Sequence, residues 1–139
     1  MIDRRKEEPL HKKLGIGERD TVHLLDVPLC VLEQLPSEIT SQQTDLECAS
    51  TILIGVTASL DIQVAVKAIG RGYMRGKKLW FLYPKRSGSI RTDINRDRGW
   101  DPIRELGLQP VAQVSAGLDW SCIRFRLATE VKTSAHRKE

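Results

Sequence analysis

Three stretches of the chain are rich in apolar and β-branched residues, and each predicts a buried strand. Residues 51–57 and 78–83 are apolar almost throughout, which is typical of parallel strands that are covered on both faces. Residues 21–27 form a shorter run of β-branched and apolar residues that stops at Pro28. The pattern therefore predicts three buried strands.

Helical spacing and turn residues predict the segments around these strands. Residues 59–69 carry apolar residues at helical spacing, with Ser59 as a natural N-cap and Asp61 in the first turn. Residues 9–14 and 29–35 predict short helices, and residues 38–40 a brief edge strand. Residues 93–106 predict a second helical region, interrupted by Gly99 and Pro102 so that its regular part is 102–106. Residues 108–116 and 120–127 alternate in character and predict a hairpin.

Strands that alternate with helices and end in a hairpin predict an α/β fold with a mostly parallel sheet. A length of 139 residues fits one domain. We expect that domain to span residues 1–128 and to be followed by a charged, disordered tail over 129–139. Because ligands bind beyond the carboxyl ends of parallel strands, segments 26–29, 57–59 and 83–93 are expected to share the ligand-binding edge.

Composition narrows the possible classes of protein. The apolar runs are far shorter than the ~20 residues that cross a membrane, and the charged N-terminus predicts no secretory signal. Three widely spaced cysteines predict reduced, buried thiols in a cytoplasmic protein, with no disulfide framework and no metal site. No serine-hydrolase, zinc-protease or P-loop pattern is present, so we name no catalytic residue.

Charge is divided sharply along the chain. Residues 20–66 contain seven acidic residues and no Lys or Arg, whereas residues 67–104 contain eleven basic and three acidic residues. One interpretation is that the basic half attracts an anionic partner, either a phosphorylated small molecule or nucleic acid. The other is a solvated basic face that pairs with the acidic half, in the same chain or in a second copy. Trp100 is the one aromatic residue of the basic loop region, which gives little support for base stacking.

The loop that follows residue 83 is the candidate ligand site. A buried strand that ends in a basic, Ser- and Gly-rich loop before a helix is suited to holding an anion. We expect Lys85 to act as a point charge and Arg86 to make a bidentate contact. Ser87, Gly88 and Ser89 are expected to form a tight turn whose N–H groups bind the anion. Thr92 and Asp93 are expected to cap the next helix. Asp93 beside Lys85 is the one pairing considered for proton transfer, and Arg96 with Asp97 is expected to brace the loop.

The same loop carries a resemblance to a known family. The run KLWFLYPKRSGSIRTDINRD, the following RELGL, the late DWSCIRFR and the early KLGI resemble a family of small, uncharacterised bacterial proteins, a domain of unknown function. The resemblance implies a three-layer, Rossmann-like sandwich similar to a shortened S-adenosylmethionine-dependent methyltransferase. Those enzymes follow their first strand with a glycine-rich turn, where this chain instead has LLDVPLCVLEQLP. Pro28 offers no N–H there, so we expect no bound cofactor.

Three functions follow from these observations. The first is a non-enzymatic or regulatory domain that holds a small anionic ligand in the loop over residues 85–93. The second is an S-adenosylmethionine-dependent transferase with an atypical cofactor site. The third is a nucleic-acid-binding protein that uses the basic half of the chain.

Overall fold

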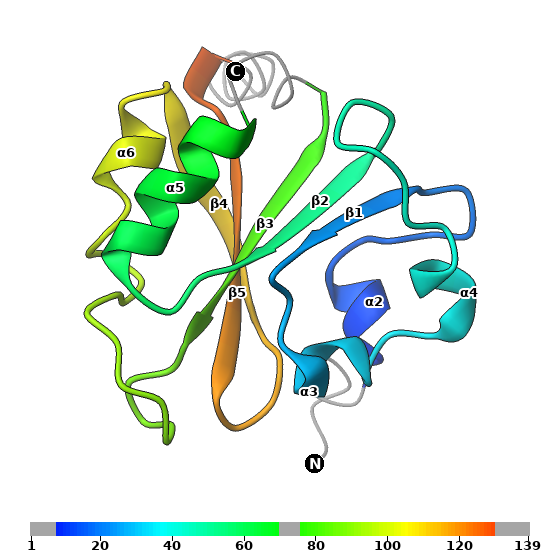
Figure 1. The fold of residues 1–139 in the computed structure, drawn as a ribbon, viewed down its shortest axis with the longest axis horizontal. Coiled ribbons are helices and arrows are strands. Elements are labelled where there is room, and N and C mark those ends of the chain that lie inside the picture. The colour runs from blue at the N-terminus through cyan, green and yellow to red at the C-terminus, as the bar shows by residue number, and fades with distance from the viewer. Residues whose placement is uncertain (1–7, 70–75, 130–139) are drawn as a thin grey trace, which may run out of the picture.

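The computed structural model describes residues 8–69 and 76–129, which form one mixed α/β unit (Figure 1). The strands are β1 (Val22–Leu25), β2 (Thr51–Gly55), β3 (Lys78–Pro84), β4 (Leu108–Ser115) and β5 (Trp120–Leu127). The helices are α2 (Leu10–Lys13), α3 (Leu29–Leu32), α4 (Ser37–Thr40), α5 (Ser59–Ile69) and α6 (Asp101–Arg104). The tail predicted over 129–139 lies, beyond its first residue, outside the described residues.

The five strands form one sheet in the order β1-β2-β3-β5-β4. β1, β2 and β3 are parallel, with Val22 opposite Thr51 and Thr51 opposite Lys78. β5 is antiparallel to both β3 and β4, so β4 runs in the same direction as β3. This arrangement confirms the prediction of a mostly parallel sheet with a C-terminal hairpin. It also brings the carboxyl ends of β1, β2 and β3 to one edge.

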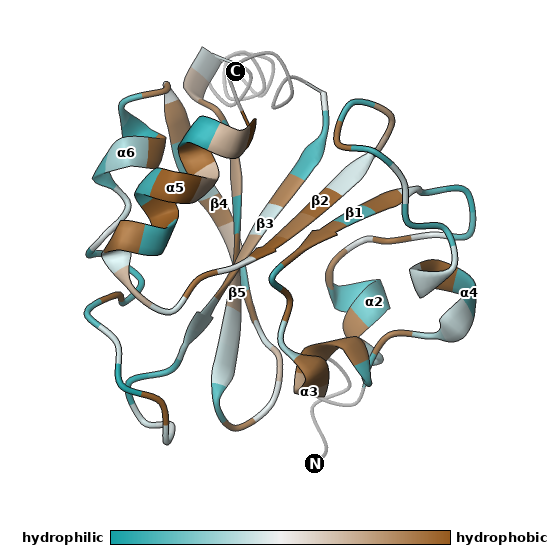
Figure 2. Ribbon diagram, viewed as in Figure 1, coloured by the Kyte–Doolittle hydropathy of each residue, from teal (hydrophilic) through white to brown (hydrophobic). Residues whose placement is uncertain are grey.

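Apolar side chains pack on both faces of this sheet. Side chains alternate along β2, so Ile52 and Ile54 belong to one buried cluster and Leu53 to the other. α5 and α6 cover the first cluster, whereas α2, α3 and α4 contribute to the second. Figure 2 shows brown, apolar bands along β1 and β2, and alternating colours along α5. Burial on both faces explains why these strands read as continuous apolar runs in the sequence.

Two of the predicted elements were wrong. Residues 38–40 belong to helix α4 and not to an edge strand, because Pro36 immediately precedes the helix and Ile39 turns into the core. Residues 93–100 are not helical, and α6 has only four residues. In that segment Asp97 N donates to Asn95 Oδ1 (2.8 Å) and Gly99 has a φ of +103°, so turn geometry replaces the helix.

The sequence predicted three buried cysteines, and this prediction is wrong for two of them. Cys30 and Cys48 are exposed, and only Cys122 lies in the core. Burial raises the pKa of the Cys122 thiol to about 12. Within the described part of the chain, no helix has the length and apolar character needed to cross a bilayer.

Candidate functional site

The predicted anion-binding turn follows β3 directly and is fixed by the β4–β5 hairpin. Lys85 N donates to the Asp119 carbonyl (2.8 Å), and Gly88 N donates to the Lys85 carbonyl (3.0 Å). Ser89 donates twice to Asp119 Oδ1, through its N–H at 2.8 Å and its hydroxyl at 3.1 Å. A carboxylate of the same chain therefore occupies part of the turn predicted to hold an external anion.

Gly88 is required by this close approach. A Cβ at this position would lie 2.8 Å from Asp119 Oδ1 and 3.0 Å from Asp119 Cα. Because one of these atoms belongs to the backbone, a side chain here would push the hairpin tip away from the loop. The turn and the hairpin tip thus form one braced unit.

A hollow of about 310 Å³ lies beside the braced turn. Four predicted residues line it, together with two that the prediction did not include: Arg86, Gly88, Ser89 and Thr92, with Ile90 and Arg91. Arg86 and Arg91 are exposed, and neither forms a hydrogen bond or ion pair with any residue in 8–69 or 76–129. Thr92 Oγ1 accepts from Ile94 N (3.0 Å), which leaves its own proton able to donate. The hollow therefore presents two guanidinium groups without a partner in the described chain.

The other predicted site residues do not line this hollow. Lys85 Nζ donates to Ser115 Oγ on β4 (2.6 Å), and Ser87 is exposed but is not among the residues that line the hollow. Asp93 instead accepts hydrogen bonds from the N–H (2.8 Å) and the hydroxyl (2.5 Å) of Ser59. Lys85 and Asp93 form no hydrogen bond or ion pair with each other among the described residues, so the structure gives no support to their pairing for proton transfer. Arg96 Nε does lie 3.7 Å from Asp97 Oδ1, but both side chains are mostly exposed.

Two carboxylates accept hydrogen bonds from the N–H and hydroxyl groups at the N-terminus of α5. Asp61 Oδ2 accepts from the N–H (3.0 Å) and hydroxyl (2.9 Å) of Thr57 and from Ala58 N (3.1 Å). These bonds hold the pKa of Asp61 below its usual value, and the bonds from the Ser59 hydroxyl and N–H do the same for Asp93. Asp93 was predicted to cap the helix that follows it; it caps the preceding α5 instead. Ser59 was predicted to be the N-cap, but it is the first residue of the helix and donates to Asp93.

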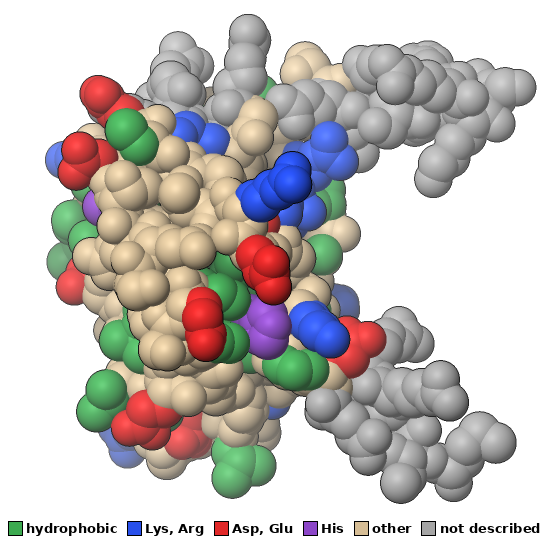
Figure 3. All heavy atoms as spheres, turned by 90° about the vertical axis from the view of Figure 1, so that its right-hand side faces the viewer, with side chains coloured by type: hydrophobic (Ala, Val, Ile, Leu, Met, Phe, Trp, Pro, Cys, Tyr) green, Lys and Arg blue, Asp and Glu red, His purple; other side chains and the backbone are tan. Residues whose placement is uncertain are grey.

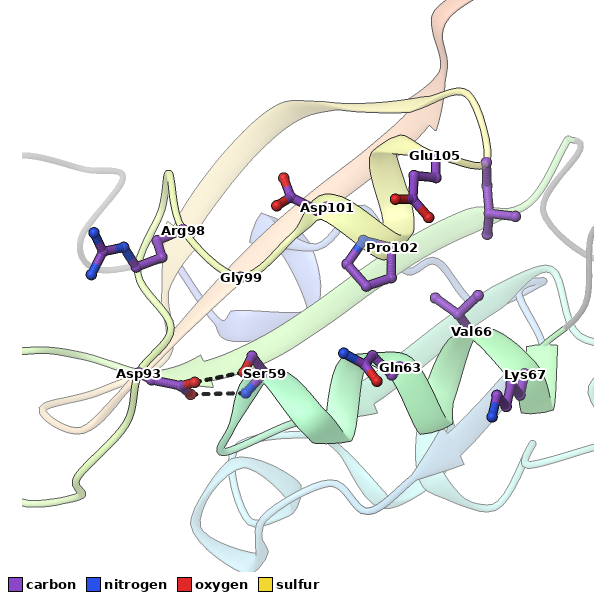
Figure 4. Close-up of a pocket in the computed structure, with 11 residues that line it drawn as sticks. Ser59, Gln63, Val66, Lys67, Asp93, Arg98, Gly99, Asp101, Pro102 and Glu105 are labelled. Atoms are coloured by element: carbon purple, nitrogen blue, oxygen red, sulfur yellow. Dashed lines mark hydrogen bonds between the residues drawn. The ribbon is translucent and has the colours of Figure 1, made fainter.

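A larger groove of about 750 Å³ separates α5 from α6 (Figure 4). Charged side chains of both signs line it, namely Lys67, Arg98, Asp93, Asp101 and Glu105. In Figure 4, Lys67 and Arg98 lie at opposite ends, and the labelled residues share only the hydrogen bonds between Asp93 and Ser59. The groove therefore lacks a set of like charges that converge on one point.

The turn after β1 packs closely against β2. Asp26 has a φ of +52°, and its carbonyl oxygen would lie 2.1 Å from a Cβ on Gly55. The ring of Pro28 approaches the same position, at 3.2 Å. Gly55 is thus needed for close contact within the chain. This turn does not form the open glycine cradle in which methyltransferases hold S-adenosylmethionine, so its residues do not fit that cofactor.

Two residues of the basic half contact other parts of the same chain, including the acidic half. Lys78 Nζ lies 3.5 Å from Asp20 Oδ2 and also donates to the Gly15 carbonyl. Lys77 Nζ donates to three carbonyls of the acidic half, those of Leu46 (3.2 Å), Glu47 (2.7 Å) and Ala49 (2.6 Å). On the side of the molecule that carries α4, side chains of both signs are interspersed (Figure 3). Pairing with the acidic half therefore accounts for two basic residues, but not for those of the loop.

The aromatic side chains do not form a stacking surface. Trp100 is 1% exposed, packs against Phe81, Tyr83 and Phe125, and donates from Nε1 to the Asn95 carbonyl (2.7 Å). Trp120 is buried as well.

The histidine of β1 has a hydrogen-bond partner within the chain. His23 Nδ1 lies 3.0 Å from the Thr44 carbonyl. Among the residues described, no group of three or more His, Cys, Asp or Glu side chains could hold a metal ion.

Comparison with known proteins does not identify a family for this chain. No family model and no curated protein matches the chain. A solved structure of Sp1610 from Streptococcus pneumoniae, a candidate tRNA (m1A22) methyltransferase, aligns with 91% of this chain and 71% of its own. The identity is 12% and the TM-score is 0.49. No functional residue is carried over from it, and the family that the loop resembles stays a prediction.

Proposed function

We propose that the protein is a ligand-binding domain that holds a phosphate-like anion in the hollow between Arg86 and Arg91. Its fold would be a shortened, methyltransferase-like form of the three-layer Rossmann sandwich, used for binding or regulation and not for catalysis. The observation that carries the proposal is that two guanidinium groups without partners in the described chain line one hollow. Arginine suits such a role because its planar fork binds phosphate and carboxylate oxygens in a bidentate manner.

The surroundings of the two arginines support the same ligand class. The hollow is about 310 Å³, at the small end of the range for ligand pockets. Hydrogen bonds to Asp119 fix the backbone on one side of it. A preorganised wall lowers the entropy lost on binding. We therefore expect a single phosphate or pyrophosphate group to be bound, with any larger part of the ligand lying outside the hollow.

The test is isothermal titration calorimetry with inorganic pyrophosphate at low ionic strength. Arg86→Ala and Arg91→Ala should each weaken binding by about tenfold, since a charge-assisted hydrogen bond contributes about 1.5–3 kcal/mol. Arg104→Ala is the matched control, because Arg104 is an exposed arginine of the basic half that does not line the hollow. Equal losses in all three variants would show only a diffuse basic field, and no binding by the wild type would refute the proposal.

Two further ligands distinguish the alternative functions. A single-stranded oligonucleotide that bound with a steep salt dependence, and more tightly than pyrophosphate, would favour the nucleic-acid function. S-adenosylmethionine that stabilised the protein against heat would favour the transferase function. We expect neither result, because the aromatic residues at this edge are buried and the turn after β1 packs onto Gly55.

A further inference from the structure

The groove between α5 and α6 carries opposite charges on its two sides at one end. Lys67 lies in the last turn of α5, and Glu105 directly follows α6. In Figure 4 they come from opposite sides of the groove, at the end away from Arg98. Neither side chain forms a hydrogen bond or ion pair with any residue in 8–69 or 76–129. One ammonium and one carboxylate group are therefore available to a ligand at the same end of the groove.

An apolar floor, formed by Val66, Pro102 and Leu106, adjoins these two charges. Val66 and Pro102 point toward each other across the groove in Figure 4, and Leu106 lines the same groove. All three side chains are partly buried, and Val66 and Leu106 pack against the core beneath α5. The core therefore fixes the floor in place, and an apolar ligand group that lies on it is shielded from water on that side.

We propose that this end of the groove binds the zwitterion of an α-amino acid with an apolar side chain. The ligand's carboxylate pairs with the Lys67 ammonium group, and its ammonium group pairs with the Glu105 carboxylate. Its side chain lies on the apolar floor. Because the two protein charges come from different elements and do not pair with each other, both are free to bind one ligand that carries both signs.

The charges along the whole groove favour a zwitterion over other ligands. A ligand that is only an anion would meet the carboxylates of Asp101 and Glu105, and one that is only a cation would meet Lys67 and Arg98. Among the described residues that line the groove none is aromatic, so a nucleobase would have no surface on which to stack. The site is thus distinct in chemistry from the arginine hollow, and it does not depend on the function proposed there.

The test is a titration of the isotope-labelled full chain with L-leucine, followed by amide chemical shifts in NMR. The groove charges are exposed and the ligand is small, so we expect a dissociation constant of about 1 mM. The largest shifts should occur at residues 66–67 and 105–106. N-acetylleucine lacks the ammonium group and leucinamide lacks the carboxylate, so each should bind about fivefold more weakly. Glycine has no side chain to place on the floor and should bind about tenfold more weakly.

Variants of the two charged residues test the pairing directly. Lys67→Met and Glu105→Gln should each weaken leucine binding about fivefold, because each removes one charge partner at an exposed position. Lys67→Glu places acidic groups on both sides and should weaken binding about tenfold. Combining it with Glu105→Lys reverses the polarity of the groove, so binding should recover to within about twofold of the wild type with the ligand turned end for end. Arg104→Glu is the matched control, since it makes the same change of charge at an exposed residue of α6 that does not line the groove.

Three results would overturn the proposal. These are an absence of saturable shifts up to about 20 mM leucine, analogues with one charge that bind as tightly as leucine, and a charge-reversed double variant that stays as weak as Lys67→Glu alone. Arg86→Ala and Arg91→Ala should leave leucine binding unchanged, because neither residue lines the groove. Lys67→Met should likewise leave pyrophosphate binding unchanged, so the two proposals can fail separately.

Discussion

Replacing Asp119 should affect stability and anion binding in opposite directions. Its carboxylate accepts two hydrogen bonds from Ser89, at 2.8 and 3.1 Å, and Ser89 lines the hollow together with Arg86 and Arg91. Asp119→Ala removes both bonds and the negative charge. Asp119→Asn keeps a side-chain oxygen that can accept from Ser89 N, but removes the charge.

The magnitudes follow from these contacts. A hydrogen bond to a charged group contributes about 1.5–3 kcal/mol, and we take about 1 kcal/mol for each of these exposed bonds. Asp119→Ala should therefore cost about 2 kcal/mol, which lowers Tm by roughly 6–10 °C for a chain of this length. Asp119→Asn should cost about half as much. An anion about 4 Å from the carboxylate is repelled by about 1 kcal/mol in water, so removing the charge should strengthen anion binding about fivefold.

Urea unfolding followed by tryptophan fluorescence measures the first effect, and calorimetric titration with pyrophosphate measures the second. The informative variant is Asp119→Asn, because a general loss of structure would weaken binding and could not strengthen it. Pyrophosphate affinity that is unchanged or lower in this variant would refute the placement of the anion beside Asp119. A Tm for Asp119→Ala within about 1 °C of the wild type would refute the bracing role.

Three other predictions concern packing and acid groups. Gly55→Ala places a Cβ 2.1 Å from the Asp26 carbonyl oxygen, so urea unfolding should show a loss of about 3 kcal/mol or more; near-wild-type stability would contradict the close packing. A thiol reagent should label two cysteines in the native protein and Cys122 only after unfolding, because Cys122 is buried and its pKa is raised to about 12. The lowered pKa values of Asp61 and Asp93 stabilise the fold at pH values above about 4, and this contribution is lost as the pH falls through their folded pKa values. Asp93→Asn should therefore flatten the acid side of the stability curve, and a curve parallel to that of the wild type would contradict the cap.

The sheet could be predicted from sequence because its signal is local. Three apolar runs marked β1, β2 and β3, and an alternating pattern marked the hairpin. α4 was missed because a four-residue helix is too short to show a helical period. The non-helical segment 93–100 was missed because turn residues such as Asn95 also favour helix starts.

The contacts of the candidate site could not be predicted because they join distant parts of the chain. Asp119 lies 30 residues from Ser89, and Asp93 lies 34 residues from Ser59. A carboxylate that caps its own helix and one that caps a distant helix have the same local sequence. Arg91 was within reach of prediction, since it is a basic residue of the same loop. What marks Arg86 and Arg91 as a pair is the shared hollow, which only the fold reveals.

The most direct test of the central claim is a titration of the isotope-labelled protein with pyrophosphate, followed by amide chemical shifts in NMR. The anion should first shift the amides of residues 86–92, with Gly88 and Ser89 among the strongest, and Arg86→Ala with Arg91→Ala should abolish those shifts. Shifts confined to the start of α5, to the turn after β1 or to the groove between α5 and α6 would place the ligand elsewhere and contradict the account.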